Sequence, residues 1–135
     1  MQGTPAIRFA SPGDTGAIHG LVCELAEFEK LSHTVVATVD DLDRALFGES
    51  PTLEALVVDA PPNEAPALAG TALFYPTYST FAGRPGLWLE DLYVRPAFRR
   101  QGLGRTLLER FLALARERDC ARAEWSVLDW NTEAI

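Results

Sequence analysis

The segment of residues 87–105 restricts the fold of this chain more than any other stretch. Residues 87–94 are mainly apolar and aromatic, which predicts a strand near the centre of a sheet. Pro96 ends this strand, and a loop rich in arginine and glycine follows at residues 99–105. From Leu103 onward, apolar residues recur at the helical spacing 103, 107, 111 and 114. The segment therefore predicts a buried strand, a glycine loop and an amphipathic helix in succession.

The junction between this loop and the helix has the composition of an anion-binding site. A helix N-terminus leaves backbone N–H groups without partners and carries a partial positive charge. Instead of the usual capping residues, the chain supplies glycines for close approach and arginines for charge, in the order Arg99-Arg100-Gln101-Gly102-Leu103-Gly104-Arg105. We expect a phosphate or pyrophosphate to bind here. The alternative is an ordinary glycine turn with solvated arginines.

Two common phosphate-binding loops do not fit this segment. A Walker loop ends in Gly-Lys-Ser/Thr, whereas Gly104 is followed by arginine and threonine. The dinucleotide fingerprint needs a third glycine where this chain has Leu107. The remaining pattern is Arg-x-x-Gly-x-Gly between a strand and a helix. It resembles the acetyl-coenzyme A loop of the GNAT family of N-acetyltransferases, with Arg99, Gly102 and Gly104 at the motif positions.

Composition limits the class of protein. A chain of 135 residues is expected to form one domain over residues 1–135. The net charge of −7 argues against a nucleic-acid partner and suits a small cationic substrate. Two separated cysteines indicate neither a disulfide framework nor a metal site. Without a leader pattern or an apolar run of membrane length, we expect a cytoplasmic protein with no membrane partner.

The rest of the chain predicts an α/β (α+β) fold. Helices are expected after the capping signatures at Ser11 and Thr38, the second helix closing at Gly48. Pro76 should force a bulge or an end in its strand. Strands are expected at 6–10, 53–60, 67–75 and 121–128, with a turn-rich loop over 78–86. This order indicates a single mixed, mostly antiparallel sheet with flanking helices.

Four further phrases resemble one branch of the same family, the diamine acetyltransferases. They are Leu25-Ala26-Glu27-Phe28-Glu29-Lys30-Leu31-Ser32, Tyr78-Ser79-Thr80, Leu89-Glu90-Asp91 and Val127-Leu128-Asp129-Trp130-Asn131. The resemblance implies a sheet splayed at its central strand, and acetyl transfer from acetyl-coenzyme A to a primary amine. The implied substrate is a small cation: thialysine, a lysine analogue, a diamine or a polyamine. Ser79 stands where the spermidine/spermine enzymes have aspartate, which weakens a spermidine assignment and matches the thialysine branch.

The chemistry of acetyl transfer assigns roles to two neighbouring acids. An alkyl ammonium must lose a proton before its nitrogen can attack a thioester. Glu90, on the central strand just before the loop, is the expected catalytic proton acceptor. Strand alternation predicts that Asp91 points to the opposite face, where it would hold the cation. The alternative is that both acids only pair with nearby arginines.

Other residues are expected to bind the ligands. A backbone N–H near Leu92 or Val94 is expected to donate to the thioester oxygen. The resemblance implies that Asn131 lies near the coenzyme arm, although this residue could instead cap a helix. It also implies a homodimer, in which Glu29 and Ser79 contribute to amine binding. No metal is expected.

The resemblance leads us to expect a tyrosine-bearing helix and a last strand beyond Ile135, so that the chain is truncated at its C-terminus and turns over slowly. The alternative function is a non-catalytic acyl-coenzyme A-binding or sensor module.

Overall fold

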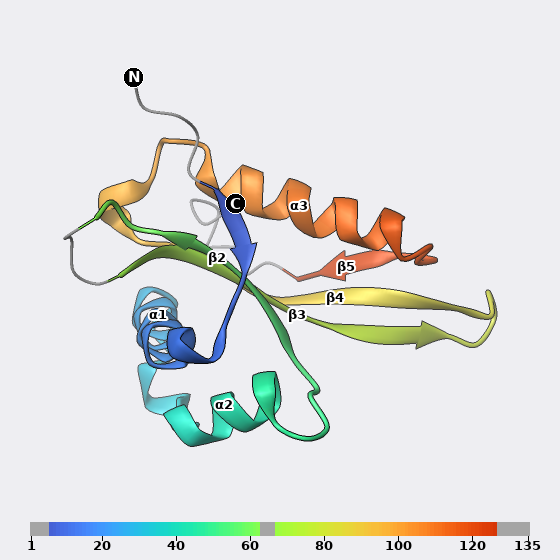
Figure 1. The fold of residues 1–135 in the computed structure, drawn as a ribbon, viewed down its shortest axis with the longest axis horizontal. Coiled ribbons are helices and arrows are strands. Elements are labelled where there is room, and N and C mark those ends of the chain that lie inside the picture. Colours follow the sequence, from blue (N-terminus) through green and yellow to red (C-terminus); the bar gives the residue numbers. More distant parts are fainter. Residues whose placement is uncertain (1–5, 63–66, 127–135) are drawn as a thin grey trace.

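One sheet organises residues 6–62 and 67–126, which are the residues described by this computed structural model (Figure 1). Its strands follow the chain in space, in the order β1-β2-β3-β4-β5. Neighbouring strands are antiparallel except for the parallel pair β4 and β5. The strands are β1 (Ile7–Phe9), β2 (Glu54–Asp59), β3 (Leu68–Ser79), β4 (Arg84–Val94) and β5 (Ala123–Trp125). The predicted mixed, mostly antiparallel sheet is confirmed, with β4 as an interior strand.

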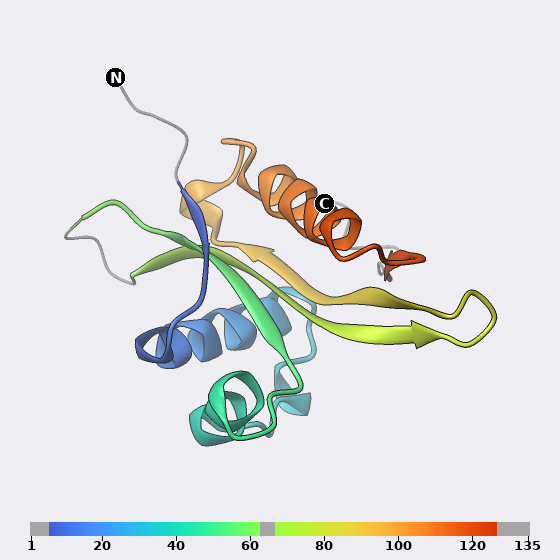
Figure 2. The same ribbon diagram turned by 45° about the vertical axis from the view of Figure 1, so that its right-hand side comes forward.

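Helices cover both faces of this sheet. The α-helices are α1 (Thr15–Phe28), α2 (Val39–Phe47) and α3 (Leu103–Glu117), with short 3₁₀ turns η1 (Pro12–Asp14), η2 (Ser32–Thr34) and η3 (Pro96–Phe98). Helices α1 and α2 lie on one face and α3 on the other (Figures 1 and 2). Two hydrophobic cores result, one between α3 and the sheet and one between the sheet and α1 and α2. In the first, Phe74 and Phe111 meet edge to face with their ring centroids 5.5 Å apart.

Local capping determines where α2 begins. The Thr38 hydroxyl accepts a hydrogen bond from the Asp41 N–H (3.1 Å), and the Asp41 carboxylate accepts one from the Thr38 N–H (2.9 Å). Helix α2 therefore begins at Val39, as predicted. Near the other signature, the Ser11 N–H donates to the Asp14 carboxylate, and α1 continues from the η1 turn.

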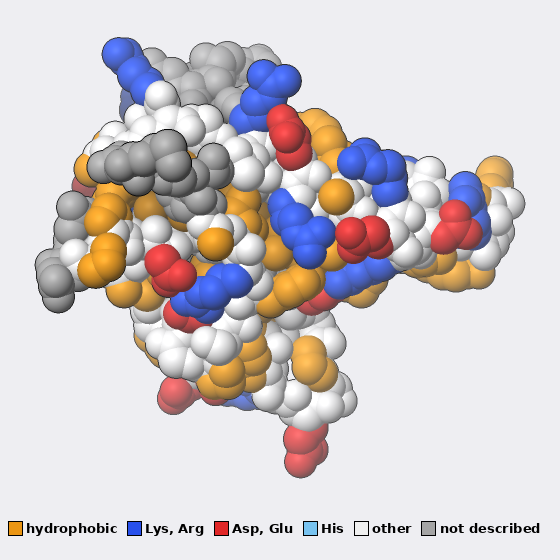
Figure 3. Space-filling model, turned by 45° about the horizontal axis from the view of Figure 1, so that its top comes forward, with side chains coloured by type: hydrophobic (Ala, Val, Ile, Leu, Met, Phe, Trp, Pro, Cys, Tyr) orange, Lys and Arg blue, Asp and Glu red, His pale blue; other side chains and the backbone are white. Residues whose placement is uncertain are grey.

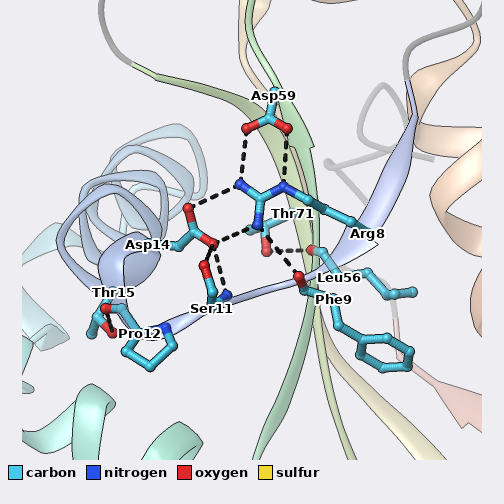
Figure 4. A network of polar contacts seen from close by, with 9 residues as sticks. All are labelled: Arg8, Phe9, Ser11, Pro12, Asp14, Thr15, Leu56, Asp59 and Thr71. Carbon is cyan, nitrogen blue, oxygen red and sulfur yellow. Dashed lines mark hydrogen bonds and ion pairs between the residues drawn. The ribbon is translucent and has the colours of Figure 1, made fainter.

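An arginine of β1 joins the first helix to the sheet. The Arg8 guanidinium contacts Asp14 at 2.7 Å and Asp59 at 2.9 Å (Figure 4). These three side chains come from β1, the η1 turn and the end of β2. The network thereby fixes the entry of α1 relative to the two strands.

The predicted loop over residues 78–86 is wrong, because most of it is strand. Strand β3 continues through Pro76 to Ser79, and β4 begins at Arg84, so that a long hairpin extends past the rest of the sheet (Figure 1). Pro76 pairs in register with Leu87, without the bulge or strand end that was expected there. The pairing of β3 with β2 ends at Phe74, so beyond it β3 has an open edge where a missing proline N–H is tolerated.

No helix among the described residues is long and apolar enough to cross a membrane. The described residues also contain no group of three or more His, Cys, Asp or Glu side chains that could hold a metal ion.

Candidate active site

Strand β4 carries a β-bulge at Glu90. Pairing with β3 runs from Val94 to Asp91, which lies opposite Leu73, and resumes at Leu89 opposite Phe74. Glu90 therefore has no partner in the ladder. A bulge adds a residue to one strand and interrupts the regular alternation of side chains.

This bulge makes the predicted orientation of Asp91 wrong, because Glu90 and Asp91 share one face of the sheet. Leu89 belongs to the core under α3, so Trp88 points to the α1 face, where its Nε1 donates to Glu90 Oε1 at 2.9 Å. Tyr93 belongs to the core under α1, and Asp91, two residues earlier, lies on the same side. The extra residue in the bulge allows both acids to reach the α1 face.

Two carboxylates share this face, and the charge of a third acts on one of them. Burial is the largest cause of a raised pKa at Asp91, and the negative charges of Glu90 and Glu29 add to it, so that the pKa reaches about 6. Glu29 is the C-cap residue of α1. Glu29, Glu90 and Asp91, all predicted as site residues, therefore lie close enough for the charges of the two glutamates to act on Asp91. An acid with a pKa near neutrality is suited to exchanging protons with a substrate.

Beside these acids, β4 has one edge that pairs with β3 and another that faces the opposite way. The Arg95 N–H donates to the Ala69 carbonyl at 2.9 Å. Because N–H groups alternate in direction along an antiparallel ladder, those of Leu92 and Val94 point away from β3. Among the described residues, β5 pairs with β4 only at residues 87–89. The N–H groups of Leu92 and Val94 therefore have the orientation that the sequence-based expectation requires.

The glycine loop leads directly into α3, which begins at Leu103 as predicted. Gly102 is the N-cap residue, and its left-handed φ of 77° favours glycine. No side chain caps this end of the helix. Its first N–H groups, in the segment that contains Leu103, Gly104 and Arg105, are suited to receive an anion.

The arginines of this region differ in their surroundings. Arg100 is exposed and has a left-handed φ of 67°, whereas Arg105 pairs with Glu109 at 2.9 Å. Gln101 is exposed as well. On the face shown in Figure 3, basic and acidic side chains lie next to each other rather than in separate patches. Arg100 and Arg105 are thus both exposed, and the charge of Arg105 is paired with Glu109.

Arg99 turns inward. Its Nε donates to the Val94 carbonyl at 2.8 Å, and its guanidinium lies over the rings of Phe28 (4.9 Å) and Tyr93 (5.5 Å). Arg95, the other arginine near the acids, pairs with Glu24 at 3.0 Å. These two arginines are therefore engaged with partners other than Glu90 and Asp91.

A pocket of about 480 Å³ opens next to this cluster, between the C-terminal half of α1 and the end of β4. It is lined by Glu24, Glu27, Phe28, Tyr93, Arg95, Pro96 and Ala97. Sequence reasoning did not assign Glu24, Tyr93 or Arg95 to a site. The signal that could have indicated an acid facing a ligand is the group Glu24, Glu27 and Glu29 near the end of the α1 sequence.

One predicted site residue, Ser79, is not brought to the acids. Ser79 pairs with Arg84, and its hydroxyl accepts the Ala82 N–H at 3.1 Å in the hairpin turn. Since Arg84 precedes Glu90 by six residues along β4, Ser79 lies ~20 Å from Glu90 at the usual rise of a strand. Asn131 lies outside the described residues.

Known proteins match both the sequence and the fold. The model of the Acetyltransferase (GNAT) family matches residues 21–135. Thialysine N-epsilon-acetyltransferase of Bos taurus is 40% identical over 96% of this chain and 78% of that protein. Its namesake in Caenorhabditis elegans is 42% identical over 93% of this chain and 74% of that protein.

Among solved structures, the ribosomal-protein-alanine N-acetyltransferase from Brucella melitensis biovar Abortus 2308 has the same fold. Its TM-score is 0.77 over 98% of this chain and 86% of that chain, at 17% sequence identity. The glycine loop before α3, the bulged strand and the family match agree, and the chain belongs to the acetyltransferase (GNAT) family, whose members are acetyl-transferring enzymes.

Proposed function

We propose that this chain transfers the acetyl group of acetyl-coenzyme A to a primary amine of a small cation, such as thialysine, a lysine analogue or a diamine. One observation carries the proposal. Glu90 and Asp91 lie on β4, the strand that leads into the uncapped start of α3, and the charge of Glu29 acts on Asp91. Acids next to an anion-binding helix end suit a cationic acceptor and a phosphate-bearing donor. The names of the curated relatives support an amine on a lysine-like side chain.

The coenzyme binds through backbone groups. Its pyrophosphate lies on the N–H groups of loop 99–105 and the first turn of α3, and the Arg100 charge faces it. The thioester carbonyl receives an N–H from Leu92 or Val94, which stabilises the negative charge that develops on its oxygen. Asn131 contacts the coenzyme arm from the segment after β5.

The acids hold the amine and remove its proton. An alkyl ammonium has a pKa near ~10.4, so at neutral pH the substrate arrives charged and is attracted by Glu29 and Asp91. Glu90 accepts the proton, and the neutral nitrogen attacks the thioester carbon. The new C–N bond forms as the C–S bond breaks, and coenzyme A leaves as a thiolate that takes up a proton. Asp91, with its pKa of about 6, is the second proton acceptor beside Glu90.

Assembly and location complete the proposal. Each chain is a single acetyltransferase domain, residues 1–135, and two chains form a homodimer in the cytoplasm. Ser79, which lies far from the acids of its own chain, contributes to amine binding within this dimer. The resemblance to the diamine acetyltransferases supports the dimer. Sedimentation at micromolar concentration should give twice the monomer mass, and a monomer only would refute this part.

A panel of amines tests the activity itself. The full chain is mixed with acetyl-coenzyme A and thialysine, lysine, ornithine, putrescine or spermidine, and the released thiol is measured. Lysine-like amines should release thiol faster than spermidine. Calorimetry with coenzyme A is the companion measurement. Binding without thiol release for any amine would favour the acyl-coenzyme A sensor, and absence of binding would refute both functions.

A further inference from the structure

The side chain of Arg99 is held on several sides within the chain. Its Nε donates to the Val94 carbonyl at 2.8 Å. Its guanidinium lies 4.9 Å from the ring centroid of Phe28, in α1, and 5.5 Å from that of Tyr93, in β4. A planar cation over aromatic faces is a favourable contact that a lysine reproduces poorly. Arg99 therefore ties the coenzyme loop to a strand and to a helix.

A second layer holds this arrangement in place. The Tyr93 hydroxyl donates to Glu24 Oε1 at 3.1 Å, and Arg95 pairs with Glu24 Oε2 at 3.0 Å. The Glu24 side chain thus joins α1 to two residues near the end of β4. With its hydroxyl anchored in this way, the Tyr93 ring is kept under the Arg99 guanidinium.

The position of Val94 links this network to the coenzyme site. In the antiparallel ladder, the N–H and C=O of Val94 both point away from β3. Arg99 binds this carbonyl, which fixes the peptide plane on the edge of β4. The same contact determines where the loop starts relative to the strand, and hence where the N–H groups of α3 point.

We propose that Arg99 is a positioning residue, which holds the glycine loop and the β4 edge in their binding geometry and does not contact phosphate with its own charge. The inference rests on the proposed coenzyme site. The guanidinium is already oriented by Val94, Phe28 and Tyr93, which hold its Nε and its plane within the chain. Exposed Arg100, and Arg105, whose exposed side chain pairs with Glu109, lack those contacts and are the arginines of the loop that can face a phosphate.

The test compares variants that separate the charge of Arg99 from its contacts. Arg99→Lys keeps the charge but loses the planar fork, Phe28→Leu removes one ring without touching the loop, and Arg100→Gln is the matched control. Each is titrated with coenzyme A and with pantetheine, which lacks phosphates, at low and high salt. Circular dichroism establishes that each variant is folded.

We expect Arg99→Lys and Phe28→Leu each to weaken coenzyme A binding about tenfold, with little salt dependence. The double variant should lose little more than either single one, because both substitutions break the same contact. Pantetheine binding should weaken in parallel, since the β4 edge shifts. Arg100→Gln should weaken coenzyme A alone, and more at low salt. Coenzyme A binding that is unchanged by Phe28→Leu, or additive losses in the double variant, would overturn the proposal.

Hydrogen exchange of the unliganded chain gives a readout that needs no coenzyme. The amides of residues 101–106 should exchange faster in Arg99→Lys and in Phe28→Leu, but not in Arg100→Gln. Equal exchange in all variants would refute the positioning role even if coenzyme A binds. Conversely, a wild-type chain that binds no coenzyme A would refute the proposed function, while the exchange rates would still decide whether Arg99 orders the loop.

Discussion

Replacing Asp91 with asparagine is expected to stabilise the fold at neutral pH while it impairs acetyl transfer. In the folded chain, burial and the charges of Glu90 and Glu29 raise the pKa of Asp91 from the ordinary 3.8 to about 6. Folding therefore disfavours the ionised form of the Asp91 carboxyl group. At ~1.4 kcal/mol per pKa unit, this difference corresponds to a cost of ~3 kcal/mol above pH 6.

The sign of the pH dependence follows from proton binding. Between about pH 4 and pH 6, the folded chain retains the Asp91 proton and the unfolded chain releases it. The Asp91 contribution to the free energy of unfolding therefore falls as the pH rises through this window, and stays low above it. Asp91→Asn removes the ionisation, so its stabilising effect should be absent near pH 4 and reach ~2–3 kcal/mol at pH 7.5.

Urea denaturation of the two chains between pH 4 and pH 8 measures this difference directly. The comparison cancels the titration of acids that do not interact with Asp91. Glu49→Gln, at an exposed turn, is the control and should give a difference near zero at every pH. If Asp91→Asn destabilises the chain at pH 7.5, or if the difference does not vary with pH, the inferred burial of this carboxylate is wrong. In the activity assay the same variant should lose roughly 10²-fold in rate.

Three other predictions concern the coenzyme loop, the proton acceptor and the Arg8 network. Gly104→Val should weaken acetyl-coenzyme A binding at least tenfold, about 1.4 kcal/mol, by blocking backbone approach, and unchanged affinity in calorimetry would remove the coenzyme assignment. Glu90→Gln should lower the rate roughly 10²-fold at neutral pH and less at high pH, where the amine is already neutral; an equal loss at every pH would indicate a structural role. The Arg8 guanidinium lowers the pKa of Asp14 to about 2, so Asp14→Asn should destabilise the chain by ~2 kcal/mol at pH 7. That difference should vanish as the pH falls from about 4 to about 2, and its persistence at pH 2 would contradict the ion pair as its cause.

Signals that lie within a few residues of one another were sufficient to predict the helices. The start of α2 at Val39 follows from the reciprocal bonds of Thr38 and Asp41, and the start of α3 at Leu103 follows from the glycine loop and the apolar spacing after it. The same loop led to the family and to the proposed coenzyme site. These features are local, because the capping side chains, the glycines and the apolar spacing all lie within a few residues of the helix ends that they predict.

Tertiary structure alone decided the details of the site. The bulge at Glu90 depends on the register between β3 and β4, which no residue near Glu90 specifies, and it brought Asp91 to the α1 face against the predicted alternation. The raised pKa of Asp91 depends first on its burial, then on the charges of Glu90 and of Glu29, the C-cap residue of α1. Arg99 turned inward because Phe28 lies under it. Ser79 became part of the hairpin turn rather than of the acid cluster. Each of these outcomes depends on contacts between residues that are far apart in the sequence. Such contacts exist only once the sheet has brought the residues together, so local sequence patterns do not reveal them.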